Sequence, residues 1–189
     1  MTKIGIILGS TRPGRRGEAV AQWTLDHANQ RHTADYELID LLDFPLPHLD
    51  EPISPSLGQY QGAHTRAWAA KVAEYDGYVF VAPEYNHSLS GVLKNALDYV
   101  YAEWNNKAAG IVSYGSAGGT RAAEHLRLIL AELQVADVRA QVTLSLLTDF
   151  ENYTTFTPDR RHEQALATML DQVESWSRAL EPLRAADAA

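Results

Sequence analysis

The sequence predicts an α/β protein in which helices cover both faces of a parallel sheet of five strands. Short strand-like runs alternate along the chain with segments whose apolar residues recur at helical spacing, and this alternation is typical of parallel sheets. The first, third and fourth runs are almost wholly apolar, whereas the second and fifth carry polar residues. Because central strands are buried on both faces, the polar strands belong at the edges, which favours the strand order 2-1-3-4-5.

The first half of the chain begins with a short run rich in β-branched residues, Ile4–Leu8, which predicts a fully buried strand. A helix is expected over Glu18–Gln30, because its apolar residues fall on one stripe. Tyr36–Leu41 predicts a second strand, interrupted by charged residues. The proline-bearing segment Asp43–Gly62 predicts a long irregular loop, typical of a functional or partner-contacting region. Ala63–Tyr75 is expected to be a helix with an apolar stripe.

The second half repeats this alternation, with apolar runs that end in proline or glycine and are followed by helical spacing. The expected elements are strand Gly77–Pro83, helix Val92–Tyr101, strand Lys107–Tyr114, a helix after Gly119, the half-exposed strand Val138–Leu144, and a last helix that begins near Thr157. A threonine cap with proline in the first turn predicts that start, and Pro182 predicts the end. We therefore expect one domain over residues 1–181 and a disordered tail over residues 182–189.

Composition restricts the class of function. The formal charge of −8 argues against a nucleic-acid-binding protein. The absence of cysteine excludes thiol nucleophiles, iron–sulfur clusters and disulfides, and we predict no metal site. No apolar run approaches the length that spans a membrane. Met1 leads directly into the first strand without a signal peptide, so we expect a cytoplasmic protein.

The loop after the first strand carries the chemistry of an anion site. Ser10–Gly17 supplies hydroxyls, glycines and the three basic residues Arg12, Arg15 and Arg16, and a helix begins directly after it. Helix N-termini offer unpaired N–H groups and the positive end of the helix dipole. A guanidinium can also hold a phosphate through two hydrogen bonds. The segment therefore predicts a phosphate site.

Two further loops are expected beside this one. Pro83–Gly91 follows the third strand and Gly115–Gly119 follows the fourth, so all three loops lie at the carboxyl edge of the sheet. In the order 2-1-3-4-5, ligands bind at this edge, where the first and third strands diverge. Aromatic Tyr85 and the glycine-rich third loop suit a planar ring. Together the loops predict a nucleotide with a phosphate tail and a flat ring system.

Three motifs resemble the NAD(P)H-dependent FMN reductases of the flavodoxin-like superfamily. They are Gly9-Ser10-Thr11-Arg12, then Pro83-Glu84-Tyr85-Asn86-His87-Ser88 with Gly91-Val92-Leu93-Lys94-Asn95-Ala96-Leu97-Asp98, and then Tyr114-Gly115-Ser116 with Gly118-Gly119. The resemblance implies a flavodoxin-like fold, FMN as cofactor, NAD(P)H (NADPH or NADH) as substrate, and an oxidoreductase that passes hydride through FMN to a small acceptor such as free flavin or a quinone. It also implies a homodimer or homotetramer.

The resemblance also assigns roles to residues. Ser10 and Arg12 would hold the FMN phosphate, while Pro83, Glu84, Tyr85 and Asn86 would line the isoalloxazine, with Gly115 and Ser116 on its other side. The family often has serine and asparagine late in the first loop, where this chain has Arg15, Arg16 and Gly17. Arg16 and the N–H of Gly17 are therefore the expected last phosphate contacts. Arg15 or Arg121 is a candidate for contact with the 2′-phosphate of NADPH.

Such chemistry needs no protein nucleophile or general base, because the flavin carries it, so no catalytic residue is predicted. Donor and acceptor would share one flavin face in turn, which predicts ping-pong kinetics. Two alternatives remain at this stage. The acidic charge also suits a flavodoxin-type electron carrier. An esterase would use Ser10 as nucleophile with Asp159 and His162, which are spaced as an Asp-x-x-His motif.

Overall fold

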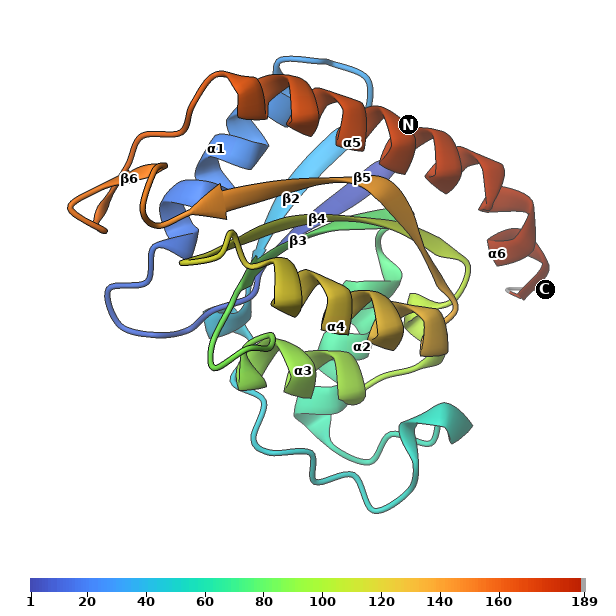
Figure 1. The fold of residues 1–189 in the computed structure, drawn as a ribbon. Helices are drawn as coiled ribbons and strands as arrows, with labels where there is room; N and C mark the ends of the chain where they lie inside the picture. The colour runs from blue at the N-terminus through green and yellow to red at the C-terminus, as the bar shows by residue number, and fades with distance from the viewer. Residues whose placement is uncertain (188–189) are drawn as a thin grey trace.

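A computed structural model describes residues 1–187, and a five-stranded parallel sheet forms its centre (Figure 1). The strands are β1 (Lys3–Leu8), β2 (Asp35–Asp40), β3 (Gly77–Pro83), β4 (Lys107–Gly115) and β5 (Val135–Ser145). They lie in the order β2-β1-β3-β4-β5, and every neighbouring pair is parallel. The predicted fold class and strand order are confirmed.

Helices cover both faces of the sheet (Figure 1). α1 (Gly17–Asn29) and α5 (Arg161–Ala179) lie on one face, and α2 (Ala63–Ala73), α3 (Gly91–Asp98) and α4 (Thr120–Glu132) lie on the other. Short 3-10 turns, η1 (Leu41–Asp43), η2 (Pro55–Leu57) and η3 (Ala102–Trp104), lie between these elements. None of the helices within residues 1–187 is long and apolar enough to cross a membrane.

Two apolar cores result from this three-layer arrangement. Alternate residues of β1 point to opposite faces, so Ile7 joins the core beneath α2, α3 and α4, while Ile6 and Leu8 join the core beneath α1 and α5. β3 and β4 are buried along their whole length, whereas β2 and β5 contain half-exposed residues. The polarity argument that placed β2 and β5 at the edges is therefore correct.

The structure differs from the sequence expectation in its last third. The stretch between β5 and α5, expected to be a plain connection, forms a small hairpin of β6 (Phe150–Glu151) and β7 (Thr155–Phe156). The hairpin is held by contact between the rings of Phe150 and Phe156, whose centroids lie 5.0 Å apart. Segments of two residues are too short to show a strand period, so no sequence pattern predicts them.

The expected disordered tail also differs over most of its length. α6 (Glu181–Asp187) is a helix, and residues 188–189 lie outside the part that the structure describes. Pro182 falls in the first turn of α6, where the missing N–H has no cost. Arg184 fastens this helix to the sheet, with hydrogen bonds to Asp76 at 2.9 Å and to the carbonyl of Asn106 at 3.0 Å.

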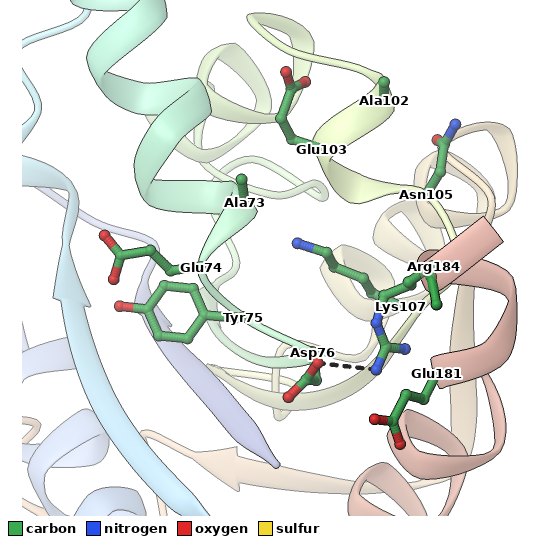
Figure 2. Close-up of a pocket in the computed structure, with 11 residues that line it drawn as sticks. Ala73, Glu74, Tyr75, Asp76, Ala102, Glu103, Asn105, Lys107, Glu181 and Arg184 are labelled. Carbon is green, nitrogen blue, oxygen red and sulfur yellow. Dashed lines mark hydrogen bonds and ion pairs between the residues drawn. The ribbon is translucent and has the colours of Figure 1, made fainter. Parts of the chain in front are cut away.

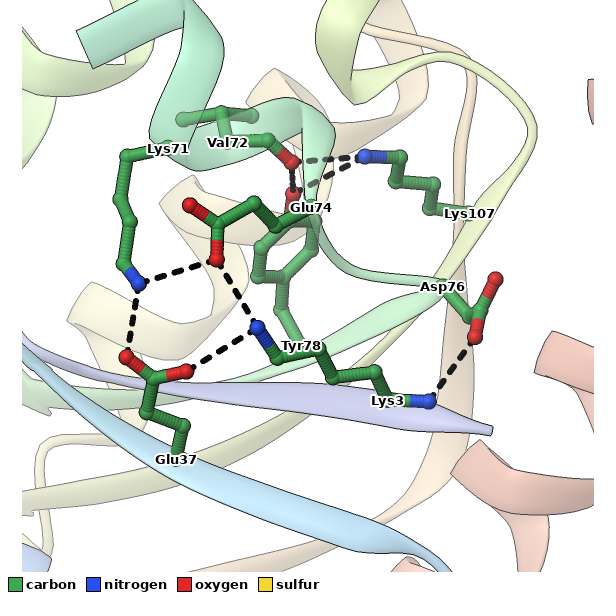
Figure 3. A network of polar contacts seen from close by, with 8 residues as sticks. All are labelled: Lys3, Glu37, Lys71, Val72, Glu74, Asp76, Tyr78 and Lys107. Atoms are coloured by element: carbon green, nitrogen blue, oxygen red, sulfur yellow. Dashed lines mark hydrogen bonds and ion pairs between the residues drawn. The ribbon is translucent and has the colours of Figure 1, made fainter. Parts of the chain in front are cut away.

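Charged side chains close the amino edge of the sheet (Figure 3). Lys3 and Lys71 alternate there with Glu37 and Glu74, and each ammonium group contacts both carboxylates within 3.1 Å. Beside this network the buried Lys107 donates to the carbonyl of Val72 at 2.7 Å and contacts the Tyr78 hydroxyl at 3.2 Å.

Candidate functional site

The three loops predicted to converge do form one cleft at the carboxyl edge of the sheet. A cavity of about 160 Å³ lies among them. Its lining residues come from the loops that follow β1, β3 and β4, and from the segment after β5: Arg12, Gly14, Arg15, Arg16, Pro83, Glu84, Tyr85, Tyr114, Gly115, Leu146 and Tyr153. Its position at the divergence of β1 and β3 is where doubly wound sheets bind nucleotides.

Ser10 lies two residues after the end of β1 and is buried, and its hydroxyl already has a protein partner. Its Oγ lies 2.9 Å from the Oη of Tyr85, which joins the first loop to the second. The Arg12 N–H also points to this oxygen at 3.4 Å. Ser10 therefore fixes the positions of Tyr85 and the loop, and it belongs to the cleft as a supporting residue.

The Arg15 side chain forms ion pairs within the protein. It is only 4% exposed and contacts both Asp40 and Glu18, with an Nη1 to Oδ1 distance of 2.8 Å to Asp40. Hydrogen bonding to Asp40 raises the pKa of Arg15. Burial acts to raise the pKa of Asp40, but the hydrogen bond from Arg15 outweighs it and lowers that pKa. The expectation that Arg15 meets a 2′-phosphate is not supported.

Arg12 and Arg16 have no such carboxylate partner within residues 1–187. Arg16 donates from Nε to the carbonyl of Tyr153 at 2.8 Å and from Nη1 to the carbonyl of Gly14 at 2.7 Å. These neutral acceptors aim the guanidinium without cancelling its charge. The Arg12 side chain is exposed at the rim. The loop thus presents two positive charges that a bound phosphate would neutralise.

The second loop is a tight turn that projects from β3. The N–H of Tyr85 donates to the carbonyl of Ser88 at 2.9 Å, and the reverse bond measures 3.2 Å. Asn86 and His87 between them have φ angles of 48° and 73°, and asparagine tolerates this left-handed region well. The turn is fixed to the next strand, because the N–H of Glu84 donates to the carbonyl of Tyr114 at 2.9 Å.

Glu84 stabilises the start of α4 with its side chain. Its carboxylate accepts from the N–H of Arg121 at 3.1 Å and forms an ion pair with the Arg121 guanidinium. Burial acts to raise the pKa of Glu84, but the bonds from Arg121 prevail and lower it. Arg121 in turn donates to Nδ1 of His87 at 3.1 Å. Arg121, the other candidate for a 2′-phosphate, thus lies beside the second loop with its charge partly balanced.

The third loop brings backbone close to the cleft. Gly118 and Gly119 both have φ of 69°, and a Cβ on Gly119 would lie 2.6 Å from the Tyr114 nitrogen. Only glycine permits this return of the chain over the end of β4. Gly115 lines the cleft, whereas Ser116 is exposed and does not.

Of the ten residues predicted from sequence, six line the cleft: Arg12, Arg16, Pro83, Glu84, Tyr85 and Gly115. Ser10 and Gly17 are buried just behind it, while Asn86 and Ser116 are exposed and lie outside its lining. The sequence reasoning missed Tyr114, Leu146 and Tyr153. Tyr114 begins the motif Tyr114-Gly115-Ser116, so its place in the cleft could have been inferred from the sequence. Leu146 and Tyr153 lie in the segment that was expected to be a plain connection.

The esterase arrangement does not form. Nε2 of His162 lies 2.9 Å from Oδ1 of Asp149 rather than on Asp159, and Asp159 accepts from the N–H of Arg161 at 2.9 Å. The Ser10 hydroxyl is paired with Tyr85. His162 and Asp149 are both buried and hold the segment before α5 in place. Within residues 1–187, no group of three or more side chains of the metal-binding types could hold a metal ion.

A larger cavity of about 520 Å³ lies at the opposite, amino edge of the sheet (Figure 2). Lys107 and Arg184 supply its positive charge, and Arg184 is paired with Asp76. Four carboxylates line it, from Glu74, Asp76, Glu103 and Glu181. This excess of negative charge disfavours a phosphate, so the smaller cleft between the three loops is the better nucleotide site.

The cleft itself fits a phosphate-bearing cofactor. A Cβ on Gly17 would lie 2.6 Å from the Tyr114 hydroxyl and 2.7 Å from Leu8, so the first turn of α1 can pack this closely against β1 and β4 only as glycine. The Tyr114 hydroxyl is buried without a hydrogen-bond partner in the described part of the chain. A bound phosphate would accept a hydrogen bond from this hydroxyl and would neutralise the charges of Arg12 and Arg16.

Comparisons with known proteins agree with this geometry. The family model of NADPH-dependent FMN reductases matches residues 2–149. The NAD(P)H-dependent FMN reductase ntnL of Nectria sp is 40% identical over 159 residues, covering 79% of each chain. NAD(P)H-dependent FMN reductase C4B3.06c of Schizosaccharomyces pombe is 42% identical over 146 residues, covering 75% of this chain and 73% of its own.

Among solved structures, the flavoenzyme NAD(P)H:(acceptor) oxidoreductase FerB of Paracoccus denitrificans has a similar fold. The TM-score is 0.73 at 19% identity, and the match covers 95% of this chain and 98% of FerB. At this identity the likeness concerns the fold alone.

Proposed function

Because this chain belongs to the family of NADPH-dependent FMN reductases, we propose that it binds FMN in the cleft and oxidises NAD(P)H with a small molecule as acceptor. The observation that carries the proposal is that Arg12 and Arg16, which have no carboxylate partner among the described residues, line one cleft together with the Pro83–Tyr85 turn. FMN when bound accepts a hydride from a nicotinamide and gives electrons to the acceptor.

The residues of the chain bind and orient. Arg12, Arg16 and the N–H of Gly17 would hold the phosphate at the start of α1. Ser10 would act through Tyr85, because its hydroxyl is bonded to Tyr85 at 2.9 Å. The backbone of Pro83–Asn86 would flank the ring on one side, and Gly115 with Ser116 on the other. No side chain is required to move a proton, so no catalytic residue is assigned.

We further propose a homodimer or homotetramer in the cytoplasm. The long loop between β2 and α2 supports assembly, because Leu42, Leu49 and Leu57 are 53%, 43% and 64% exposed. Exposed apolar side chains grouped on one segment are typical of contact surfaces. The electron-carrier alternative is not favoured, because the family and the relatives named above are reductases that use NAD(P)H.

A titration tests the cofactor assignment directly. Purified protein stripped of flavin is added to FMN, and quenching of flavin fluorescence is recorded at micromolar protein. Saturable quenching is expected, together with NAD(P)H oxidation when a small quinone is supplied. Unchanged flavin fluorescence across the titration would remove the proposal.

A further inference from the structure

Tyr114 has a hydroxyl for which the described protein provides no partner. It is the penultimate residue of β4, only 5% exposed, and its Oη makes no hydrogen bond within residues 1–187. Leaving a buried hydroxyl unsatisfied costs the free energy of its lost hydration. Such an atom needs an explanation, and in this chain it lies in the lining of the cleft.

The groups around this oxygen show which kind of partner is missing. Oη lies 2.6 Å from the position of a Cβ on Gly17, at the first turn of α1. The Gly17 N–H there is a donor, and the guanidinium groups of Arg12 and Arg16 on the same cleft are donors as well. The nearby Ser10 oxygen is already bonded to Tyr85. Ser10 Oγ also has the Arg12 N–H as a partner at 3.4 Å, and no atom of residues 1–187 accepts a hydrogen bond from Oη of Tyr114. An acceptor on a bound ligand would therefore complete the cluster.

The phenol is in the state that can donate to an acceptor. Burial raises the pKa of Tyr114, and the charge of a nearby Tyr85 phenolate would raise it further, while the neighbouring Ser10 hydroxyl, the charge of Arg15 and the Gly17 N–H act to lower it. The hydroxyl therefore keeps its proton throughout the neutral pH range. Ser10 and Gly17 lie near Oη without reaching hydrogen-bond geometry. Because the Tyr114 hydroxyl lies beside the N-terminus of α1, it belongs with the loop Ser10–Gly17 rather than with the Pro83–Tyr85 turn.

We propose that the Tyr114 hydroxyl donates a hydrogen bond to the phosphate of the bound flavin nucleotide. This ligand comes from β4 and lies outside the loop that carries Arg12 and Arg16. It would help the site to distinguish FMN from riboflavin, which has no phosphate. The inference rests on the proposed function, because it concerns the same cleft.

The test is Tyr114→Phe, which removes one oxygen and keeps the ring. Dissociation constants for FMN and riboflavin are measured by quenching of flavin fluorescence. We expect FMN binding to weaken by about 10-fold or more, the scale of a hydrogen bond to a charged group, and riboflavin binding to change by less than about 2-fold. Equal losses for both flavins, or unchanged FMN binding, would overturn the proposal.

Tyr75→Phe is the matched control. Tyr75 is also a buried tyrosine whose hydroxyl has no hydrogen-bond partner in the described chain, but it lies at the amino edge of the sheet. It should leave both dissociation constants unchanged. If the parent protein binds neither flavin, the proposed function itself fails, and that outcome differs from FMN binding that is insensitive to Tyr114→Phe.

Thermal unfolding gives a second readout that does not depend on activity. Removing an orphaned buried hydroxyl should raise the melting temperature of the flavin-free protein by a few degrees. The same change should reduce the additional stabilisation that saturating FMN provides. A Tyr114→Phe protein that is less stable without flavin and equally stabilised by FMN would contradict the inference, because the hydroxyl would then be satisfied by the protein.

Discussion

Replacement of Lys107 by methionine should change how the stability of the protein depends on pH. The Lys107 side chain lies at the amino edge of the sheet, on the Val72 carbonyl and the Tyr78 hydroxyl, and no carboxylate of residues 1–187 forms an ion pair with it. Burial lowers the pKa of Lys107 from 10.5 to about 7, with help from the charge of Arg184 and against the charges of Asp76 and Glu103. At pH 9 the folded chain has therefore released a proton that the unfolded chain still holds.

The sign and size of the effect follow from this difference. Stability rises with pH wherever the unfolded state binds more protons than the folded state. For the Lys107 pKa values of about 7 folded and 10.5 unfolded, the gain between pH 7 and pH 9 is about 2 kcal/mol. Lys107→Met should remove this rise. The Val72 carbonyl remains satisfied in the variant, because the Tyr78 hydroxyl donates to it at 2.5 Å.

The assay is urea unfolding of the FMN-saturated protein at pH 7, 8 and 9, with free energies extrapolated to water. The control is Lys71→Met, in the neighbouring network (Figure 3). Burial acts to lower the pKa of Lys71, but Glu37 and other partners raise it overall, so Lys71 stays charged in both states over this range. Its loss should lower stability equally at each pH. A Lys107→Met profile parallel to that of the parent would refute the burial argument.

Four further results are expected. Arg12→Ala should weaken FMN binding by about 1.5–3 kcal/mol and barely affect riboflavin, and equal losses would mean that Arg12 is structural. Ser10→Ala should cost less and leave NAD(P)H oxidation intact, whereas an ester-hydrolysing activity that Ser10→Ala abolishes would contradict this role. Light scattering at working concentration should report a dimer or larger assembly, and a monomer would contradict the proposed loop contact. Double-reciprocal plots at several acceptor concentrations should be parallel, and intersecting lines would show two separate substrate sites.

The parts of the fold that were predictable from sequence are those with strong local patterns. β3 was expected at its observed bounds, Gly77–Pro83, because a wholly apolar run ends in proline there. β5 begins at Val135, three residues before its expected start. The first three residues were missed because Asp137 interrupts the apolar pattern there. α3 ends at Asp98 although the apolar spacing continues to Tyr101. Tyr99 is buried there by contact with the long loop, where its hydroxyl meets the Pro47 carbonyl at 3.1 Å.

The site was predictable only as far as its loops. Residue types in the first loop indicated a phosphate site, but they could not show that, within residues 1–187, Arg15 pairs with carboxylates of the protein while Arg12 and Arg16 do not. The difference lies in Asp40, 25 residues away, whose carboxylate holds Arg15. The pairing of His162 with Asp149 rather than Asp159 likewise depends on how the chain folds back before α5. Such pairings are set by tertiary packing and leave no local period in the sequence.

The hydrogen bond from Arg16 to the Tyr153 carbonyl has a consequence for synthesis on the ribosome. It joins positions 137 residues apart, and Tyr153 lies beyond the residues 2–149 that match the family model. A chain emerging N-terminus first makes the arginine loop early, but it cannot fix the Arg16 side chain until the hairpin after β5 has left the exit tunnel. Nascent chains that stop before residue 153 should therefore capture FMN more poorly than chains that include the hairpin.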